Sequence, residues 1–305
     1  MQPDHIFPVL PDLYLIELAP PVKGFDNFIG VWAHTARPRF IVDTGPSVTA
    51  KALLTALAKI NMEAPDYVLL THIHMDHAGA AGEIARTFPD AAIVCHENAI
   101  PHLVNPEKLQ AGTVKTLGDI GRAYGPMLSV PEERIVNVAG LNLSGLTALM
   151  TPGHAPHHVS FLTSDSILFA GEACGVNIQF SGDSIYMRPA TPPRFRLETT
   201  MASIDKLIQA QPDIICFGHF GMQLHAVTLL KQHRDQLLFW KDMVVDELAA
   251  GNDKNLTERC VNRLLTEDPL LRGLNQAEAS IRERERFFIH NSIQGIARYI
   301  VSDDH

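Results

Sequence analysis

The chain has 305 residues, of which 46% are hydrophobic and 19% charged, and its formal net charge is −9. This composition excludes a disordered or low-complexity protein. No apolar run approaches the roughly 20 residues of a membrane helix, the first residues show neither the basic n-region nor the h-region typical of a signal peptide, and the basic residues form no long cluster. We therefore expect a cytoplasmic protein with neither a membrane nor a nucleic-acid partner.

Short β-type runs alternate with helical patterns along the first 220 or so residues. Apolar, branched runs predict strands at 13–18, 27–33, 39–43, 67–70, 91–96, 146–150, 158–163, 166–171 and 213–218. Apolar residues three and four apart predict helices at 48–60, 78–88 and 197–210. This alternation is typical of a layered α/β domain whose strands are buried between helices.

The pattern changes after His219. Leu230, Leu237 and Val244 lie on one helical stripe, and the isoleucines of 289–300 form another. We predict a main domain over residues 1–221 and a helical C-terminal extension over residues 222–305 that packs on it. The extension is expected to line the active-site cleft or to form a homodimer surface, and the charge run at 282–286 is interpreted as a solvated helix face.

A dense group of metal-binding residue types follows the predicted strand 67–70. His72, His74, Asp76 and His77 lie within six residues, directly before the predicted helix 78–88. On a strand-to-helix turn these side chains can converge on a small volume, and neutral imidazoles with a carboxylate suit zinc or a similar metal. The spacing therefore predicts a metal site at this turn.

This H-x-H-x-D-H segment resembles the hallmark motif of the metallo-β-lactamase superfamily. Four other blocks are similar to family segments and follow in the family's order: VDTG at 42–45, TPGHAPHHVSF at 151–161, FAGE at 169–172 and CFGHFG at 216–221. The resemblance implies a four-layer αβ/βα sandwich as the catalytic domain, with an α-helical C-terminal extension.

The same resemblance implies a site for two divalent metal ions, with zinc favoured and iron or manganese as alternatives. Carried over residue by residue, it places one ion on His72, His74 and His154 and the other on Asp76, His77 and His219. Glu172 stands where the family has a bridging aspartate. Because glutamate is one methylene longer, it bridges both ions, binds only one, or selects another metal, and these alternatives stay open.

Two further residues match positions around the family's ligands. Asp43 resembles the carboxylate that orients a ligand histidine, with turn capping as the alternative. His158 is expected to support the site rather than to bind metal. The four cysteines have no paired spacing and are interpreted as reduced, and Cys174 is either a thiolate ligand or an ordinary buried cysteine.

Residues 181–200 contain three prolines and a glycine, which predicts a loop at the rim of the site. Tyr186 and Arg188 are the candidates within it for substrate contacts. A structural crossover with surface ion pairs is the alternative interpretation of the same segment.

The resemblance implies a hydrolase similar to the glyoxalase II and lactonase-like branches. A metal-bound hydroxide, oriented by Asp76, would cleave a small ester, thioester or lactone. A di-iron protein that handles oxygen or nitric oxide is one alternative, since glutamate also suits iron. A nuclease or phosphodiesterase of the same fold is another, although neither a clamping insertion nor a basic face is present. A non-catalytic binding protein is a further alternative, but in such a protein the complete set of metal ligands would have no function.

Overall fold

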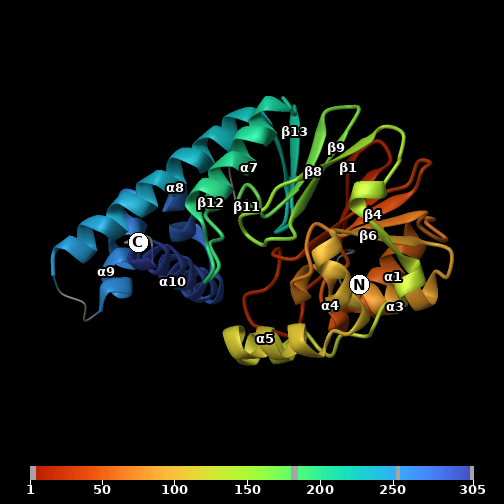
Figure 1. Ribbon diagram of the computed structural model, residues 1–305, viewed down its shortest axis with the longest axis horizontal. Helices are drawn as coiled ribbons and strands as arrows, with labels where there is room; N and C mark the ends of the chain where they lie inside the picture. The colour runs from red at the N-terminus through yellow and green to blue at the C-terminus, as the bar shows by residue number, and fades with distance from the viewer. Residues whose placement is uncertain (1–4, 180–184, 252–254, 303–305) are drawn as a thin grey trace.

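Two β-sheets packed face to face form the centre of the protein (Figure 1). The computed structural model describes residues 5–179, 185–251 and 255–302. The larger sheet has the order β1 (Ile6–Leu10), β2 (Leu13–Glu17), β3 (Gly30–His34), β4 (Phe40–Val42), β5 (Tyr67–Leu69), β6 (Ala92–Cys95) and β7 (Ile135–Asn137). Its pairs are antiparallel up to β4 and parallel from β4 to β7.

The second sheet is mostly antiparallel and has a parallel pair at β10 and β13. Its order is β14 (Met222–Leu224), β13 (Ile214–Phe217), β10 (Ile167–Gly171), β9 (Val159–Thr163) and β8 (Leu146–Met150). A separate hairpin joins β11 (Val176–Gln179) to β12 (Ile185–Arg188).

Helices cover the outer faces of both sheets. The α-helices are α1 (Ala50–Lys59), α2 (Met75–Ala78), α3 (Ala81–Thr87), α4 (Ile100–Val104), α5 (Glu107–Leu117), α6 (Asp119–Ala123), α7 (Leu197–Gln209), α8 (Ala226–Ala249), α9 (Leu256–Glu267) and α10 (Ala279–Ser302). Short 3₁₀ helices are η1 (Ser47–Thr49), η2 (Glu97–Ala99), η3 (Glu132–Arg134), η4 (Val138–Gly140) and η5 (Pro269–Gln276). None of the helices in the described ranges is both long and apolar enough to cross a membrane.

Side-chain alternation along the strands explains the layers. Trp32, Phe40 and Phe169 point into the space between the sheets, where Phe169 lies 6.2 Å from Trp32 and 5.8 Å from Phe40 by ring centroid. Val68 and Leu168, on the opposite faces, join the core formed with the helices. Successive side chains of a strand face opposite sides, so strands buried on both faces produce the expected four-layer sandwich.

The expected helical extension is confirmed as α8, α9 and α10, which gather at one end of the molecule (Figure 1). The boundary at residue 221 stays a prediction, and packing crosses it. Gln236 of α8 donates to the carbonyl of Met187 at 2.7 Å, and Thr191 donates to the carbonyl of Ser292 at 2.7 Å. The β11–β12 hairpin thus packs on the extension.

Two sequence interpretations of charged or polar segments are wrong. The stretch 181–200 is not one loop, because 185–188 forms strand β12 and α7 begins at Leu197, while 181–184 lies outside the described residues. The run at 282–286 is not a uniformly solvated face, since Arg284 is 4% exposed and Glu285 0%. The first error arises because 185–188 pairs with β11 as a strand. The second arises because α10 packs against β12, so polar side chains are buried between them.

The buried carboxylate of Asp268 stabilises the extension. Its Oδ2 accepts hydrogen bonds from Gln236 Nε2 at 2.8 Å and Trp240 Nε1 at 2.7 Å. Asp268→Ala leaves the buried Trp240 Nε1 without a partner and removes one of the two acceptors of Gln236 Nε2, so we expect the free energy of unfolding at pH 7 to fall by about 2 kcal/mol. Urea denaturation measures this change.

A matched control is Asp242→Ala, which removes an exposed carboxylate from the same helix bundle and should change the free energy of unfolding by less than about 0.5 kcal/mol. Equal stability of Asp268→Ala and wild type would show that these hydrogen bonds do not hold the extension.

Candidate metal centre

The turn after β5 and the start of α2 present the H-x-H-x-D-H segment at one end of the larger sheet. Ile73 and Met75 are buried in the core formed with the helices, at 1% and 0% exposure. These two apolar anchors fix the backbone of the turn. The coordinating residue types that alternate with them, His72, His74 and Asp76, are thereby held together on the remaining side of the turn.

Three imidazoles meet at one side of the site. His74 Nδ1 lies 3.0 Å from His72 Nε2 and 2.8 Å from His154 Nε2. His154 comes from the segment between β8 and β9, so the second sheet contributes to this group. Together with Glu172 these side chains form one cluster able to hold a metal ion.

A second cluster able to hold an ion consists of Asp76, His77 and His219. His219 Nε2 lies 3.4 Å from His77 Nε2 and 3.6 Å from Asp76 Oδ2. His219 follows β13, so this cluster also combines the two sheets.

Glu172 lies between the two clusters. Its Oε2 is 2.7 Å from His154 Nε2 and 3.6 Å from His77 Nε2, while Oε1 is 3.4 Å from His219 Nε2. The carboxylate of Glu172 therefore contacts imidazoles from both groups.

The spacing of these atoms fits metal coordination. Nitrogen ligands at about 2.0–2.1 Å from a tetrahedral ion lie about 3.3 Å from one another. The separations between ligand atoms lie on both sides of this value, from 2.7 Å between His154 Nε2 and Glu172 Oε2 to 3.9 Å between His77 Nε2 and Asp76 Oδ2. Imidazole lone pairs that face each other at such distances repel unless a cation or a proton lies between them.

Hydrogen bonds on the far side of each ring orient the lone pairs. His154 Nδ1 donates to the carbonyl of Ala190 at 3.0 Å, and His219 Nδ1 donates to the carbonyl of Phe28 at 3.2 Å. A proton held at Nδ1 leaves Nε2 as an acceptor that can bind metal. Sequence reasoning missed both carbonyl partners, because any residue supplies a backbone carbonyl.

Asp43 connects the strands that carry the site. Its Oδ2 accepts a hydrogen bond from His77 Nδ1 at 2.8 Å, and its Oδ1 accepts one from the backbone N–H of Thr71 at 2.8 Å. Thr71 Oγ1 donates to the same carboxylate and lies 3.1 Å from His72 Nδ1. Asp43 thus touches one ligand directly and another through Thr71.

His158 holds the backbone of Glu172 in place through a hydrogen bond. Its buried Nε2 accepts a hydrogen bond from the backbone N–H of Glu172 at 3.0 Å, so its Nδ1 carries the proton donated to Thr151 Oγ1 at 2.9 Å. A Cβ at Gly171 would lie 2.4 Å from His158 Nε2, and Gly171 has a φ of +55°. Glycine is therefore required at this position for Glu172 to enter the site.

The charges of the ligands depend on one another. Burial opposes ionisation of Glu172, but His154 and His219 hold the pKa of its carboxyl well below the usual range. Burial also opposes protonation of His77, yet Asp43 and Asp76 raise its pKa to about 9. Burial and the neighbouring His154 lower the pKa of His74 to about 4. At neutral pH the site therefore holds an ionised carboxylate, a neutral imidazole at His74 and a protonated imidazole at His77, and His77 must lose its proton when a divalent ion binds.

The family to which the chain belongs follows from its sequence. A family model described as the metallo-beta-lactamase superfamily matches residues 31–219. The chain belongs to this superfamily. The predicted resemblance and the predicted fold are thereby confirmed.

Several relatives within the superfamily are similar to most of the chain. Metallo-beta-lactamase fold-containing protein ST1585 of Sulfurisphaera tokodaii is 28% identical over 71% of this chain and 80% of its own length. The solved structure of ST1585 has a TM-score of 0.62 over 74% of this chain and 86% of its own, at 26% identity. Metallo-beta-lactamase family protein TTHA1429 of Thermus thermophilus has a TM-score of 0.62 at 19% identity, over 96% and 94% of the two chains.

A third relative carries the name of an enzyme. Hydroxyacylglutathione hydrolase of Yersinia pestis is 28% identical over 64% of this chain. The match spans 62% of that enzyme's length, which is less than two thirds.

The structure places Tyr186 and Arg188 away from an exposed rim. Both side chains are buried, and both donate to Glu285 Oε2, Tyr186 Oη at 2.7 Å and Arg188 Nε at 2.5 Å. Cys174 is also buried and belongs to neither ligand cluster, and burial raises the pKa of its thiol.

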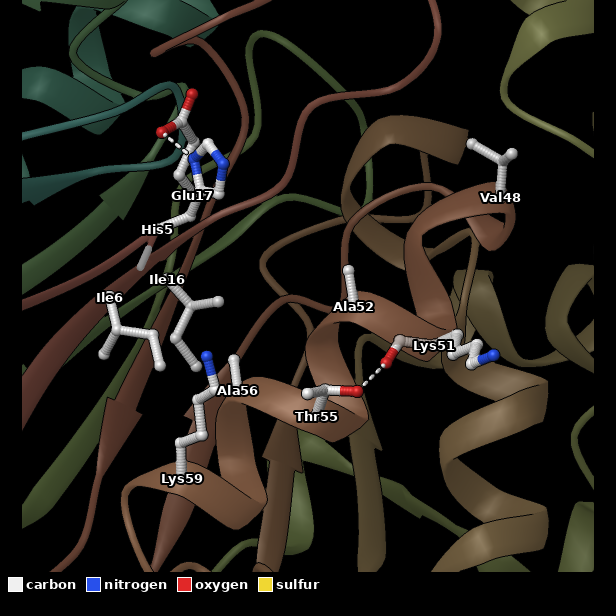
Figure 2. Close-up of a pocket in the computed structure, with 10 residues that line it drawn as sticks. All are labelled: His5, Ile6, Ile16, Glu17, Val48, Lys51, Ala52, Thr55, Ala56 and Lys59. Atoms are coloured by element: carbon white, nitrogen blue, oxygen red, sulfur yellow. Dashed lines mark hydrogen bonds and ion pairs between the residues drawn. The ribbon is translucent and has the colours of Figure 1, made fainter. Parts of the chain in front are cut away.

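A surface cavity of about 490 Å³ lies between the β1–β2 edge and α1. Figure 2 shows its lining, with the carboxylate of Glu17 turned to the ring of His5 and the side chains of Lys51 and Lys59 on α1. None of the seven clustered ligand residues lines it. The chemistry of the metal centre is therefore separate from this cavity.

We expect Asp43→Asn to weaken metal binding at the cluster that contains His77. An amide cannot accept from both His77 and the Thr71 N–H, so it leaves His77 unpartnered or forces the tautomer that cannot bind metal. The affinity for one zinc ion should fall about 10–100-fold, as measured by competitive chelator titration.

Asp12→Asn is the control, because Asp12 is exposed and has a similar positive φ of 59°, against 63° at Asp43. Asparagine tolerates this backbone conformation, so both variants should fold. Unchanged zinc affinities in Asp43→Asn would exclude Asp43 from the metal centre.

Proposed function

We propose that this protein is a binuclear metallo-hydrolase that cleaves a small ester, thioester or lactone. The observation that carries the proposal is the arrangement of two ligand clusters around one carboxylate, Glu172. His72, His74 and His154 would hold one ion, and Asp76, His77 and His219 the other. Two divalent ions in such a site lower the pKa of bound water towards about 7 and polarise a substrate carbonyl.

Zinc suits the ligand set of five imidazoles and two carboxylates, because it is a borderline ion that binds both imidazole nitrogen and carboxylate oxygen. The Yersinia relative named hydroxyacylglutathione hydrolase supports hydrolysis of a small acyl compound over the di-iron and nuclease alternatives.

Asp76 is the residue proposed to orient the attacking water. Its side chain is 15% exposed, compared with 6% for Glu172 and 1% for His77, so it is the more accessible carboxylate of the site. Its Oδ2 faces His77 and His219, and within the described residues its other oxygen makes no hydrogen bond. That oxygen can accept a proton from water and aim the remaining lone pair at a carbonyl carbon.

Asp76→Ala tests this proposal. The variant should lose about 10²–10⁴-fold in kcat/KM on any substrate found, because it lacks the group that positions the water. It should keep the ion held by His72, His74 and His154. Hydrolysis assays with thioester, lactone and phosphodiester panels, together with elemental analysis, measure both effects.

Asp119→Ala is the control, since its carboxylate is 97% exposed on α6. The mechanism would be wrong if Asp76→Ala retained near-normal turnover. Selective turnover of phosphodiesters would favour the nuclease alternative.

A further inference from the structure

Phe28 contacts the ligand residue His219 in two ways. Its carbonyl oxygen accepts the hydrogen bond from His219 Nδ1 at 3.2 Å, and its ring stacks on the imidazole at 4.3 Å between centroids and 21° between planes. The two residues are 0% and 3% exposed. Among the described residues, Phe28 is the one aromatic side chain outside the ligand clusters that contacts this imidazole. A single residue therefore governs both the tautomer and the ring plane of His219.

The plane of the imidazole decides whether His219 can bind metal. The lone pair of Nε2 lies in the plane of the ring, so a bond to an ion forms only when the ion lies close to that plane. The hydrogen bond at Nδ1 fixes one atom of the ring but leaves the plane free to tilt around it. The stacked ring of Phe28 covers one face of the imidazole and blocks this tilt.

The opposite face of the Phe28 ring carries a cation. The guanidinium carbon of Arg284 lies 3.9 Å from the ring centroid of Phe28. Two planar groups this close to one centroid would overlap on the same face, so Arg284 and His219 must lie on opposite faces of the ring. The negative charge of an aromatic face attracts a cation, and a guanidinium also stacks flat against it. Arg284, Phe28 and His219 thus form a stack of three planar groups.

Helix α10 holds the outer side of this stack. Arg284 Nη1 donates to the carbonyl of Gly24, in the connection between β2 and β3 that also carries Phe28. A Cβ at Gly24 would lie 2.6 Å from the carbonyl oxygen of Ser280, and Gly24 has a φ of +84°, so only glycine allows this approach to α10. Phe288, one helical turn after Arg284, lies 5.7 Å from Phe28 between ring centroids. The extension therefore fixes both the backbone and the ring of the segment that orients His219.

We propose that Phe28 and Arg284 are positioning residues for His219, so that the C-terminal extension sets the affinity of one ligand cluster for its ion. The inference rests on the proposed binuclear site and adds a control that lies outside the ligand set. It concerns the cluster that contains His219. In the other cluster, His154 is oriented by the carbonyl of Ala190, so its ion should respond much less to changes in the stack.

Zinc affinities of the full chain test the proposal without a substrate. Competitive chelator titration of wild type should resolve two binding steps, and His219→Ala identifies the step that belongs to the cluster with His219. Phe28→Leu keeps an apolar side chain and the backbone carbonyl but removes the stacked ring. We expect it to weaken that step about tenfold and the other step less than about twofold.

Arg284→Met tests the contribution of the extension. Methionine keeps an apolar contact with Phe28 and removes the cation. Arg188 stays paired with Glu285, to which its Nε donates at 2.5 Å, so the variant leaves no unbalanced buried charge in this pair and should fold. We expect it to weaken the same step about threefold, because the attraction that holds the Phe28 ring parallel to the imidazole is lost.

Phe25→Leu is the matched control. Phe25 is 1% exposed and contacts Phe28 at 5.3 Å between ring centroids and Arg284 at 5.7 Å, so the variant removes a ring from the same aromatic cluster. Within the described residues Phe25 makes no ring contact with His219. The ratio of the two zinc affinities should therefore keep its wild-type value in Phe25→Leu. A purely structural role of the cluster would instead affect Phe25→Leu and Phe28→Leu alike.

The proposal is overturned if Phe28→Leu keeps the wild-type ratio of the two affinities, if Phe25→Leu changes that ratio as much as Phe28→Leu, or if Arg284→Met leaves it unchanged. Where Phe28→Leu does not fold, Arg284→Met decides. A single zinc ion in wild type would contradict the binuclear function and this inference together. Two ions in wild type, with an unchanged ratio in the variants, would contradict this inference alone.

Discussion

The carboxylate of Glu172 lies buried among imidazoles, and the surrounding structure must keep these groups together. Its two oxygens lie 2.7 Å from His154 Nε2 and 3.4 Å from His219 Nε2. A buried carboxylate and several imidazole lone pairs cannot be desolvated at this spacing unless hydrogen bonds and cations compensate them. Three features keep these groups together: the positive φ at Gly171, the imidazole of His158, and the carboxylate of Asp43, which accepts hydrogen bonds from His77 and Thr71.

The sandwich architecture explains why the site forms where it does. The larger sheet contributes the turn after β5, and the second sheet contributes the segments that carry His154, Glu172 and His219. Both ligand clusters combine residues from the two sheets, so the site exists only when the sheets are packed face to face. Metal binding would therefore stabilise that packing, since a complete ligand set is absent from the unfolded chain.

The spacing of His72, His74, Asp76 and His77 is a local signal, and the resemblance to the superfamily added His154, Glu172 and His219, so the seven clustered side chains could be predicted from the sequence. The sequence could not predict the carbonyl groups of Phe28 and Ala190, which orient two ligand rings, because backbone groups carry no residue signature. The buried pair of Arg284 and Glu285 was misread for another reason. A run of charged residues on a helix usually faces water, and only the tertiary contact with β12 buries this one.

The C-terminal extension links these observations. Its helix α10 packs against the β2–β3 connection through Arg284 and against β12 through Glu285. Phe28, on that connection, stacks on His219, and its carbonyl oxygen accepts the hydrogen bond from the same ring. The extension is therefore connected to the metal centre through one aromatic residue, Phe28.

Anomalous X-ray diffraction from crystals of the zinc-reconstituted protein tests the central claim most directly. The account predicts two zinc peaks about 3.5–4 Å apart, with Glu172 between them. One peak must lie on His72, His74 and His154, and the other on Asp76, His77 and His219. A single peak at saturating zinc, or two peaks with Glu172 outside both coordination shells, would contradict it.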